Sequence, residues 1–181
     1  FYERFPTRVA AILALLGTYE HPLDGFFGTG TLLRHVVQAA APLSVKVPRP
    51  LQAVWHAALA GPLCVPFAHQ FVVNPQAAPR DDLDAWRTHL ADVDVACFMH
   101  LARDLAGHST THVLPRITVP TLVVAGGRDN FTPVSKGRRM HEQITGSELV
   151  VVPQASHMGL AEFPDIINPQ VHAFLRRHFP G

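Results

Sequence analysis

Asp129 and His157 are the residues whose types and positions best suit acid–base chemistry, because each follows shortly after an apolar run. The runs cover residues 121–125 and 149–152, and continuous Val and Leu runs of this length are typical of strands buried on both faces. Open α/β sheets bind their ligands at the carboxyl ends of such strands. A carboxylate bonded to one imidazole nitrogen fixes the tautomer and leaves the other nitrogen free to act as a base.

A plainer interpretation of the same two residues is also open. Turns after strands favour Asp, and the chain contains 12 His. A solvated turn Asp and an unrelated surface His therefore fit the spacing equally well. Residue types and spacing alone do not decide between the two interpretations.

The segment between the two apolar runs carries helix signals. Thr132 is a candidate N-cap, Pro133 stands at the expected first helical position, and Gly146 is where a C′ glycine is expected. Residues 134–145 are therefore predicted to form a helix. The order becomes strand, loop with Asp, helix, strand, loop with His.

Residues 116–181 resemble the last third of an α/β-hydrolase. Residues 117–124 (ITVPTLVV) are similar to the family's entry into its penultimate core strand. The sequence GGRDNFTP at residues 126–133 resembles the G-x-x-D-x-x-x-P loop that carries the acid of the catalytic triad. The text SHMGLAEFP at 156–164 resembles the histidine loop and the start of the last helix. The resemblance implies that Asp129 and His157 are the acid and base of the triad.

The start of the chain supplies a third candidate strand. Residues 9–16 (VAAILALL) are apolar, although their pattern also fits a short buried helix. Residues 1–8 are predicted to be the end of a helix that stops around Pro6. By resemblance to the family, residues 9–16 correspond to the strand that follows the nucleophile helix. The predicted fold class is α/β: the C-terminal part of an α/β-hydrolase sheet, with about three parallel strands, flanking helices and an inserted helical cap.

No motif for the nucleophile is present in the sequence. This family carries its nucleophile on a strained strand-to-helix turn, G-x-S-x-G, which does not occur here. Ser109 follows Gly107-His108, but Thr111 replaces the second glycine and a predicted helix precedes it. The chain also begins with Phe1. The resemblance therefore implies that the nucleophile and the N-terminal half of the core lie outside this sequence.

Residues 21–115 are rich in Pro and Ala, with helical patterns and no clear strand. A helical insertion at this place is where the family carries its cap. The predicted domains are a core strand with the preceding helix end (1–20), a helical cap (21–115) and the C-terminal core (116–181). The predicted helices of the cap are 32–41 up to Pro42, 51–60 with Pro50 as candidate first residue, 83–90 with Asp81 or Asp82 as N-cap, and 93–106.

Some residues of the cap have two interpretations. His108 and His112 have helical spacing for a metal, but no Cys or carboxylate stands at a matching position, so we expect no metal. Residues 25–30 (GFFGTG) are predicted to form a turn and lack the pattern of a phosphate-binding loop. Five large side chains fit either an acyl pocket or ordinary helix packing: Trp55, Phe67, Phe71, Phe98 and Met99.

The last segment, residues 164–178, is predicted to be an amphipathic helix that covers one face of the sheet. Its last turn contains cations, which suit the carboxyl end of a helix dipole. The apolar side contains Ile166, Ile167, Val171, Phe174 and Leu175.

Composition excludes several partners. A formal net charge of +1 predicts no strong attraction to nucleic acid or anionic membranes, and no apolar run approaches the roughly 20 residues that span a bilayer. Cys64 and Cys97 lack metal or redox spacing and are predicted to be reduced packing residues of a cytoplasmic protein. The oligomeric state stays open.

By resemblance, the complete enzyme hydrolyses a small carboxylic ester or related acyl substrate by a Ser-His-Asp mechanism, without cofactor. This chain alone is expected to be inactive because the nucleophile is missing. The same fold also hosts epoxide hydrolases, dehalogenases, haloperoxidases and acyltransferases. A non-catalytic hydrolase-like protein that acts through binding, or an inactive truncated fragment, are the remaining alternatives.

Overall fold

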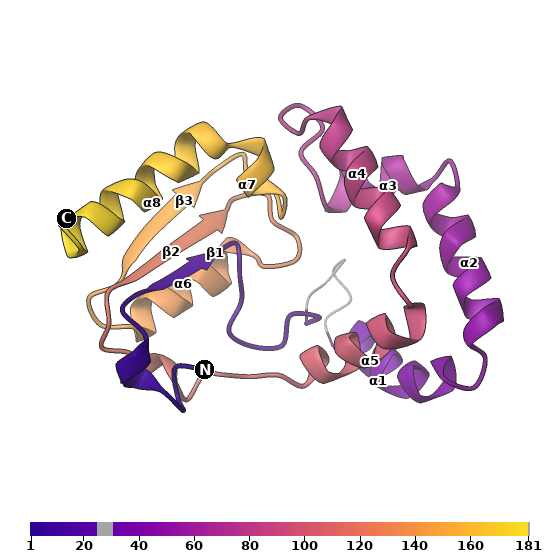
Figure 1. Ribbon diagram of the computed structural model, residues 1–181, viewed down its shortest axis with the longest axis horizontal. Coiled ribbons are helices and arrows are strands. Elements are labelled where there is room, and N and C mark those ends of the chain that lie inside the picture. The colour runs from indigo at the N-terminus through magenta and orange to yellow at the C-terminus, as the bar shows by residue number, and fades with distance from the viewer. Residues whose placement is uncertain (25–30, 181) are drawn as a thin grey trace.

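The computed structural model describes residues 1–24 and 31–180, and Figure 1 shows them as a sheet region beside a helical region. The turn predicted at residues 25–30 lies outside the described residues. Helices and parallel strands alternate, and the helical region is inserted between the first and second strands. The predicted α/β class is therefore confirmed.

Three parallel strands form the sheet, and the central one is fully buried. All six residues of β2 are buried, with Val124 opposite Leu15 on one side and Val150 on the other. Burial on both faces explains why this strand is a continuous apolar run and not an alternating one. The strands, in their order across the sheet, are β1 (Ile12–Leu15), β2 (Thr121–Gly126) and β3 (Glu148–Val152).

Two helices cover opposite faces of the sheet (Figure 1). α6 (Val134–Gln143) packs against the face that carries Val123, and α8 (Pro164–His178) packs against the face that carries Leu122. Phe174 of α8 has no exposed surface and lies in the core on its side of the sheet. Successive residues of β2 therefore point into two separate cores.

The helix between β2 and β3 begins at Val134, as predicted, but it ends two residues earlier, at Gln143, and its N-cap residue differs. Pro133 occupies the N-cap position, one residue before α6 begins, and no side-chain capping hydrogen bond is present. Thr132 does not cap because its hydroxyl hydrogen-bonds instead to Leu16 O at 2.9 Å and to Asp129. Gly146 has φ of +77°, a left-handed conformation that glycine adopts without strain just beyond a helix.

The residues before β1 do not form the predicted helix end. They form a turn and a short 3₁₀ helix, η1 (Pro6–Arg8), which Pro6 begins and does not stop. Proline suits a first helical position because its φ is fixed and its missing N–H has no partner to lose there. β1 itself is a strand, which decides between the two alternatives, but it is shorter than the apolar run at 9–16.

The helical region contains one helix that was not predicted, α3, and the bounds of all four predicted helices differ. Pro42 lies inside α1, α2 begins at Pro48, and Asp81 and Asp82 lie in the first turn of α4 without capping it. Asp94 caps α5 by accepting from Cys97 N at 2.7 Å, so this helix begins two residues later than predicted. The region consists of α1 (Leu32–Ser44), α2 (Pro48–Ala60), α3 (Cys64–Phe71), α4 (Arg80–Ala91) and α5 (Val95–Ala106).

Aromatic contacts join the helices of this region. Trp55 Nε1 donates to Leu90 O at 2.8 Å, and the Trp55 ring lies 5.1 Å from the Phe98 ring between centroids. These contacts connect α2, α4 and α5. They favour the packing interpretation for Trp55 and Phe98.

Two side chains are more exposed than predicted. Cys97 is exposed and free, so it is not a packing residue, whereas free Cys64 is partly buried. Ile166 is 48% exposed although it was placed on the apolar side of the last helix, where Ile167 is fully buried. Neighbouring residues on a helix point about 100° apart, so Ile166 and Ile167 cannot both face the core.

No single helix among the described residues is long and apolar enough to cross a membrane. α2 and α3 taken together reach that length and composition, but they are bent by 76° where they meet.

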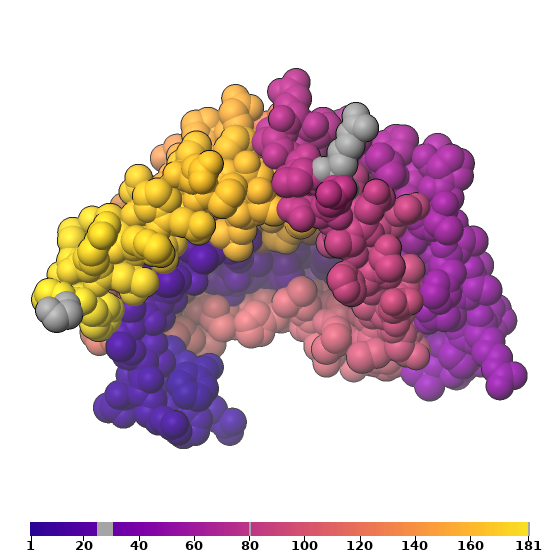
Figure 2. Space-filling view, turned by 45° about the horizontal axis from the view of Figure 1, so that its top comes forward, coloured from indigo at the N-terminus to yellow at the C-terminus, as the bar shows by residue number. Residues whose placement is uncertain are grey.

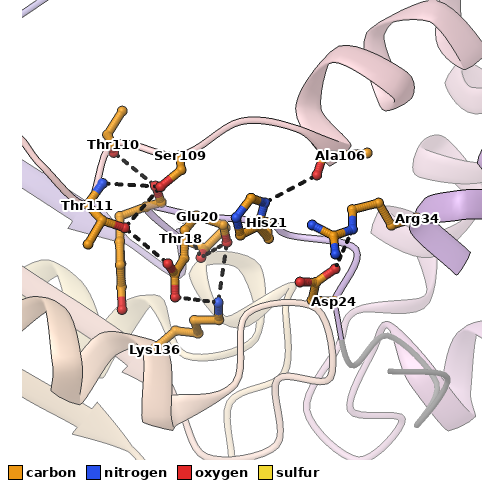
Figure 3. Close-up of polar contacts among 11 residues, drawn as sticks. Thr18, Glu20, His21, Asp24, Arg34, Ala106, Ser109, Thr110, Thr111 and Lys136 are labelled. Atoms are coloured by element: carbon orange, nitrogen blue, oxygen red, sulfur yellow. Dashed lines mark hydrogen bonds and ion pairs between the residues drawn. The ribbon is translucent and has the colours of Figure 1, made fainter. Parts of the chain in front are cut away.

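A polar junction fixes the place where the helical region joins the sheet region. Residues 17–24 leave β1 and residues 107–113 return toward β2, and the two segments lie side by side (Figure 3). Glu20 accepts from Lys136 of α6 and from Thr111, each at 3.0 Å. The hydrogen bonds to Lys136 and Thr111 outweigh desolvation and lower the pKa of Glu20. One ionised carboxylate thus ties both linkers to the sheet region.

The outer edge of β1 leads to a prediction about association. β1 pairs with β2 on one side, and no strand among the described residues pairs with the other. Leu13 on this strand is 38% exposed. Unpaired apolar edges template pairing with other chains, and a Lys on the edge suppresses it. We expect the 181-residue chain to associate in sedimentation velocity, and Leu13→Lys to shift it towards monomer.

The matched control for this experiment is Leu32→Lys, which makes the same change at a leucine of α1 that is 62% exposed. It should leave the association unchanged. If both variants shift the chain towards monomer to the same extent, the association depends on exposed helix surface and not on the β1 edge.

Candidate active site

Asp129 and His157 lie in the loops that follow β2 and β3, at the same edge of the sheet. His157 Nδ1 is 3.0 Å from Asp129 Oδ2. The predicted meeting of the two side chains is therefore observed. It excludes the alternative of a solvated turn Asp and an unrelated His.

The Asp129 carboxylate is buried and fully hydrogen-bonded. Oδ1 accepts from Phe131 N and Thr132 N, each at 2.8 Å. Oδ2 accepts from Thr132 Oγ1 at 2.7 Å and from His157. Burial opposes ionisation, but the hydrogen bonds from His157 and Thr132 outweigh it and hold the pKa of Asp129 below its ordinary value. The site therefore holds an ionised carboxylate with no exposed side-chain surface.

This carboxylate sets the tautomer of His157. An ionised carboxylate only accepts hydrogen bonds, so Nδ1 of the imidazole must carry the hydrogen. Nε2 then carries the lone pair in the neutral ring. The His157 side chain is 35% exposed, whereas that of Asp129 is 0% exposed. The pair thus consists of a buried anion and a partly accessible base.

The ring of Phe131 restricts His157 from a second direction. The two rings are stacked, with centroids 4.8 Å apart and planes 15° from parallel. Sequence reasoning missed Phe131 and the role of Thr132, although both lie within three residues of Asp129. Only their closeness to the acid in sequence could have indicated them.

Two glycines allow the acid loop and the histidine loop to cross closely. A Cβ on Gly126 would meet Ala155 O at 2.6 Å, and one on Gly127 would overlap Pro153 O. Gly127 N donates to Val152 O at 2.9 Å, which links the two loops. The close backbone contact that brings Asp129 to His157 therefore requires glycine at both positions.

The other candidate residues lie elsewhere. Ser109 is in the return linker, paired with Glu20 in an antiparallel bridge and 3.0 Å from Thr111 Oγ1. It is not on a strand-to-helix turn. His112 Nε2 pairs with Glu3 at 3.1 Å. Within the described residues, no group of three or more His, Cys, Asp or Glu side chains is arranged to hold a metal ion.

The hydrogen bonds of Asp129 predict a pH-dependent contribution to stability. The folded pKa lies below the ordinary value of 3.8, so the contribution is complete well above pH 3.8 and is lost as the pH falls through the folded pKa. We expect Asp129→Asn to lower the free energy of unfolding by about 2 kcal/mol near neutral pH and by less in acid. Urea titrations from pH 7 downward measure this difference.

Asp104→Asn is the control, because the Asp104 side chain is 75% exposed. It should differ little from the wild type at any pH. A difference for Asp129→Asn that stays constant into strong acid would contradict the assignment of the shift to the native carboxylate.

Sequence comparison identifies relatives of part of the chain. The chain is 38% identical over 68 residues to pimeloyl-[acyl-carrier protein] methyl ester esterase of Neisseria meningitidis. The aligned segment covers 38% of this chain and 24% of that protein. It is 39% identical over 59 residues to human protein ABHD8, covering 33% of this chain and 13% of ABHD8. The chain thus spans about a quarter or less of these curated relatives.

Structure comparison matches nearly the whole chain. An esterase from Thermogutta terrifontis superposes with a TM-score of 0.68 at 18% identity, covering 98% of this chain and 60% of that one. An esterase from Exiguobacterium antarcticum gives 0.67 at 17% identity, covering 96% and 61%. At these identities the likeness establishes the fold.

A family model described as TAP-like protein, one of the α/β-hydrolase families, matches residues 85–178, just over half of the chain. This match spans β2, α6, β3 and α8 and therefore includes both loops of the site. The chain belongs to the TAP-like family of α/β-hydrolases.

Proposed function

We propose that the complete protein is a serine hydrolase of small carboxylic esters, with Asp129 and His157 as the acid and base of its triad. The observation that carries the proposal is the 3.0 Å contact between His157 Nδ1 and the buried Asp129 carboxylate. This contact fixes the tautomer of His157, so Nε2 is the nitrogen that can accept a proton from a nucleophile. The esterases among the relatives support the ester as substrate class.

Each residue has one task in the proposed reaction. A serine hydroxyl attacks the ester carbonyl while His157 Nε2 takes its proton, and His157 returns that proton to the leaving alcohol. A water molecule that His157 deprotonates then attacks the acyl group and releases the acid from the serine. Asp129 keeps the proton on Nδ1 and stabilises the imidazolium that forms. Phe131 limits rotation of the imidazole ring. Neither metal nor organic cofactor enters this mechanism.

We place the nucleophile outside these 181 residues. The G-x-S-x-G turn does not occur in the sequence, and the chain spans 60% of the Thermogutta terrifontis esterase and 24% of the esterase relative. By this proposal the 181-residue chain alone does not turn over ester. Aspartate in the place of serine would redirect the chemistry to that of dehalogenases or epoxide hydrolases.

The helical region is proposed to be the cap of the site, with residues 21–115 as the cap and 1–20 and 116–181 as the core. α3 and the residues after it form an apolar cluster around Val72 and Val73. Phe131 and Met158, from the two loops of the site, pack against that cluster. Such contact supports a role in excluding water and selecting the substrate.

Replacing the base tests the proposal directly. In the full-length protein, His157→Ala should lower kcat/KM for nitrophenyl esters by at least about a thousandfold, because loss of a triad member removes concerted proton transfer. His172→Ala, an exposed histidine of α8, should keep wild-type turnover. Circular dichroism should show both variants folded. Retained turnover in folded His157→Ala contradicts the proposal.

A fluorophosphonate probe locates the nucleophile. We expect covalent labelling of one serine outside these 181 residues, and loss of labelling in His157→Ala, since the probe reacts with a serine activated by its base. Peptide mass spectrometry identifies the labelled residue. Labelling of Ser109 would place the nucleophile inside the chain, and labelling of no residue would favour an aspartate nucleophile or a non-catalytic protein. Either result contradicts a serine nucleophile outside the chain.

A further inference from the structure

Glu162 is a buried carboxyl group next to the candidate site that the proposed mechanism does not use. It is the last residue of α7 (Gly159–Glu162) and is 7% exposed. Oε1 accepts from Asn74 N at 2.6 Å and from Ser156 Oγ at 2.5 Å, and Oε2 accepts from Ser156 N at 2.9 Å. A buried carboxyl group with three donors around it holds those donors in place.

The donors to Glu162 come from two parts of the chain. Ser156 immediately precedes His157, and its Oγ also accepts from Met158 N at 3.1 Å. The backbone on both sides of His157 is therefore fixed by the same group of hydrogen bonds. Asn74 belongs to the segment between α3 and α4, in the helical region.

One further hydrogen bond runs parallel to this link, and Val72 O shares the Ser156 hydroxyl hydrogen with Glu162. Ser156 Oγ lies 2.8 Å from Val72 O, and Asn74 Nδ2 donates to Gln154 O at 2.9 Å. Figure 2 shows the segment after α3 and the C-terminal segment in contact at the top of the molecule, as these bonds require. The contact between the helical region and the histidine loop is thus polar and buried, with Glu162 at its centre.

We propose that Glu162 is a positioning residue that sets the placement of His157 and the docking of the helical region through one carboxyl group. It reaches His157 only through the backbone of Ser156. Its two oxygens serve two segments: Oε2 fixes the histidine loop, and Oε1 joins that loop to Asn74. The catalytic meaning of this placement rests on the proposed function, whereas the placement itself does not.

The geometry predicts a graded response to substitution. Glu162→Gln keeps the size but turns one acceptor oxygen into a donor, so it opposes either Ser156 N or Asn74 N and keeps the other bond. Glu162→Ala removes all three bonds. Because displacement of a catalytic group by about 1 Å costs roughly a hundredfold in rate, we expect kcat to fall about that much in Glu162→Ala and less in Glu162→Gln.

The experiment uses the full-length protein and two readouts that do not need turnover. Amide hydrogen exchange should be faster at both Ser156 N and Asn74 N in Glu162→Ala, and at one of the two in Glu162→Gln. Proton NMR of protein with ¹⁵N-labelled histidine should show the downfield Nδ1–H signal of His157, assigned by its loss in His157→Ala. That signal should broaden or disappear in Glu162→Ala and persist, weakened, in Glu162→Gln.

Two control variants separate positioning from loss of charge and from general destabilisation. Glu142→Gln makes the same chemical change at an exposed residue of α6 and should leave every readout unchanged. Ile167→Ala creates a cavity under α8 and should lower the melting temperature without changing the Nδ1–H signal or the exchange at Ser156 N.

The outcomes are distinguishable. Unchanged exchange and an unchanged Nδ1–H signal in Glu162→Gln overturn the positioning role, whatever the activity. Changes of equal size in Ile167→Ala also overturn it, because they reduce it to stability. Faster exchange and a weakened signal in Glu162→Gln support it even if His157→Ala retains turnover, a result that would overturn only the proposed function.

Discussion

The burial of one ionised carboxylate constrains the whole site. Asp129 has no exposed side-chain surface, and a buried charge is tolerated only when donors surround it. Two donors are backbone N–H groups of its own loop, and the others are the Thr132 hydroxyl and the His157 ring. The acid loop must therefore fold around the carboxylate, and the histidine loop must approach it from the next strand.

The sheet makes this approach possible. β2 and β3 are adjacent and parallel, so the loops that follow them emerge at the same edge. Gly126 and Gly127 let the two loops come closer than any side chain would permit. Thr132 Oγ1 adds a bond to Leu16 O at the end of β1, so the third strand is also tied to the acid loop. All three strands thus converge on the same few polar groups.

The helical region is attached at two places of different character. At the junction of the linkers, Glu20 binds Lys136 and Thr111 near the sheet. At the far end, Asn74 and its neighbours reach the histidine loop through Glu162. A region that is inserted between two strands and held both at its linkers and at Asn74 has a defined position next to the loops. This attachment accounts for the packing of Phe131 and Met158 against the cluster after α3.

The sequence by itself determined the parallel strands, the helix from Pro164 to His178 and the pairing of Asp129 with His157, since apolar runs, helix-end residues and loop motifs are local signals. The helix boundaries predicted at prolines were wrong, because proline can start a helix or interrupt one. Only the surrounding packing decides between these two outcomes. Tertiary structure alone decided the contacts of Thr132 and Glu162. Thr132 contacts Leu16, which is 116 positions away in the chain, and Glu162 contacts Asn74, which is 88 positions away. No local sequence pattern encodes such a contact.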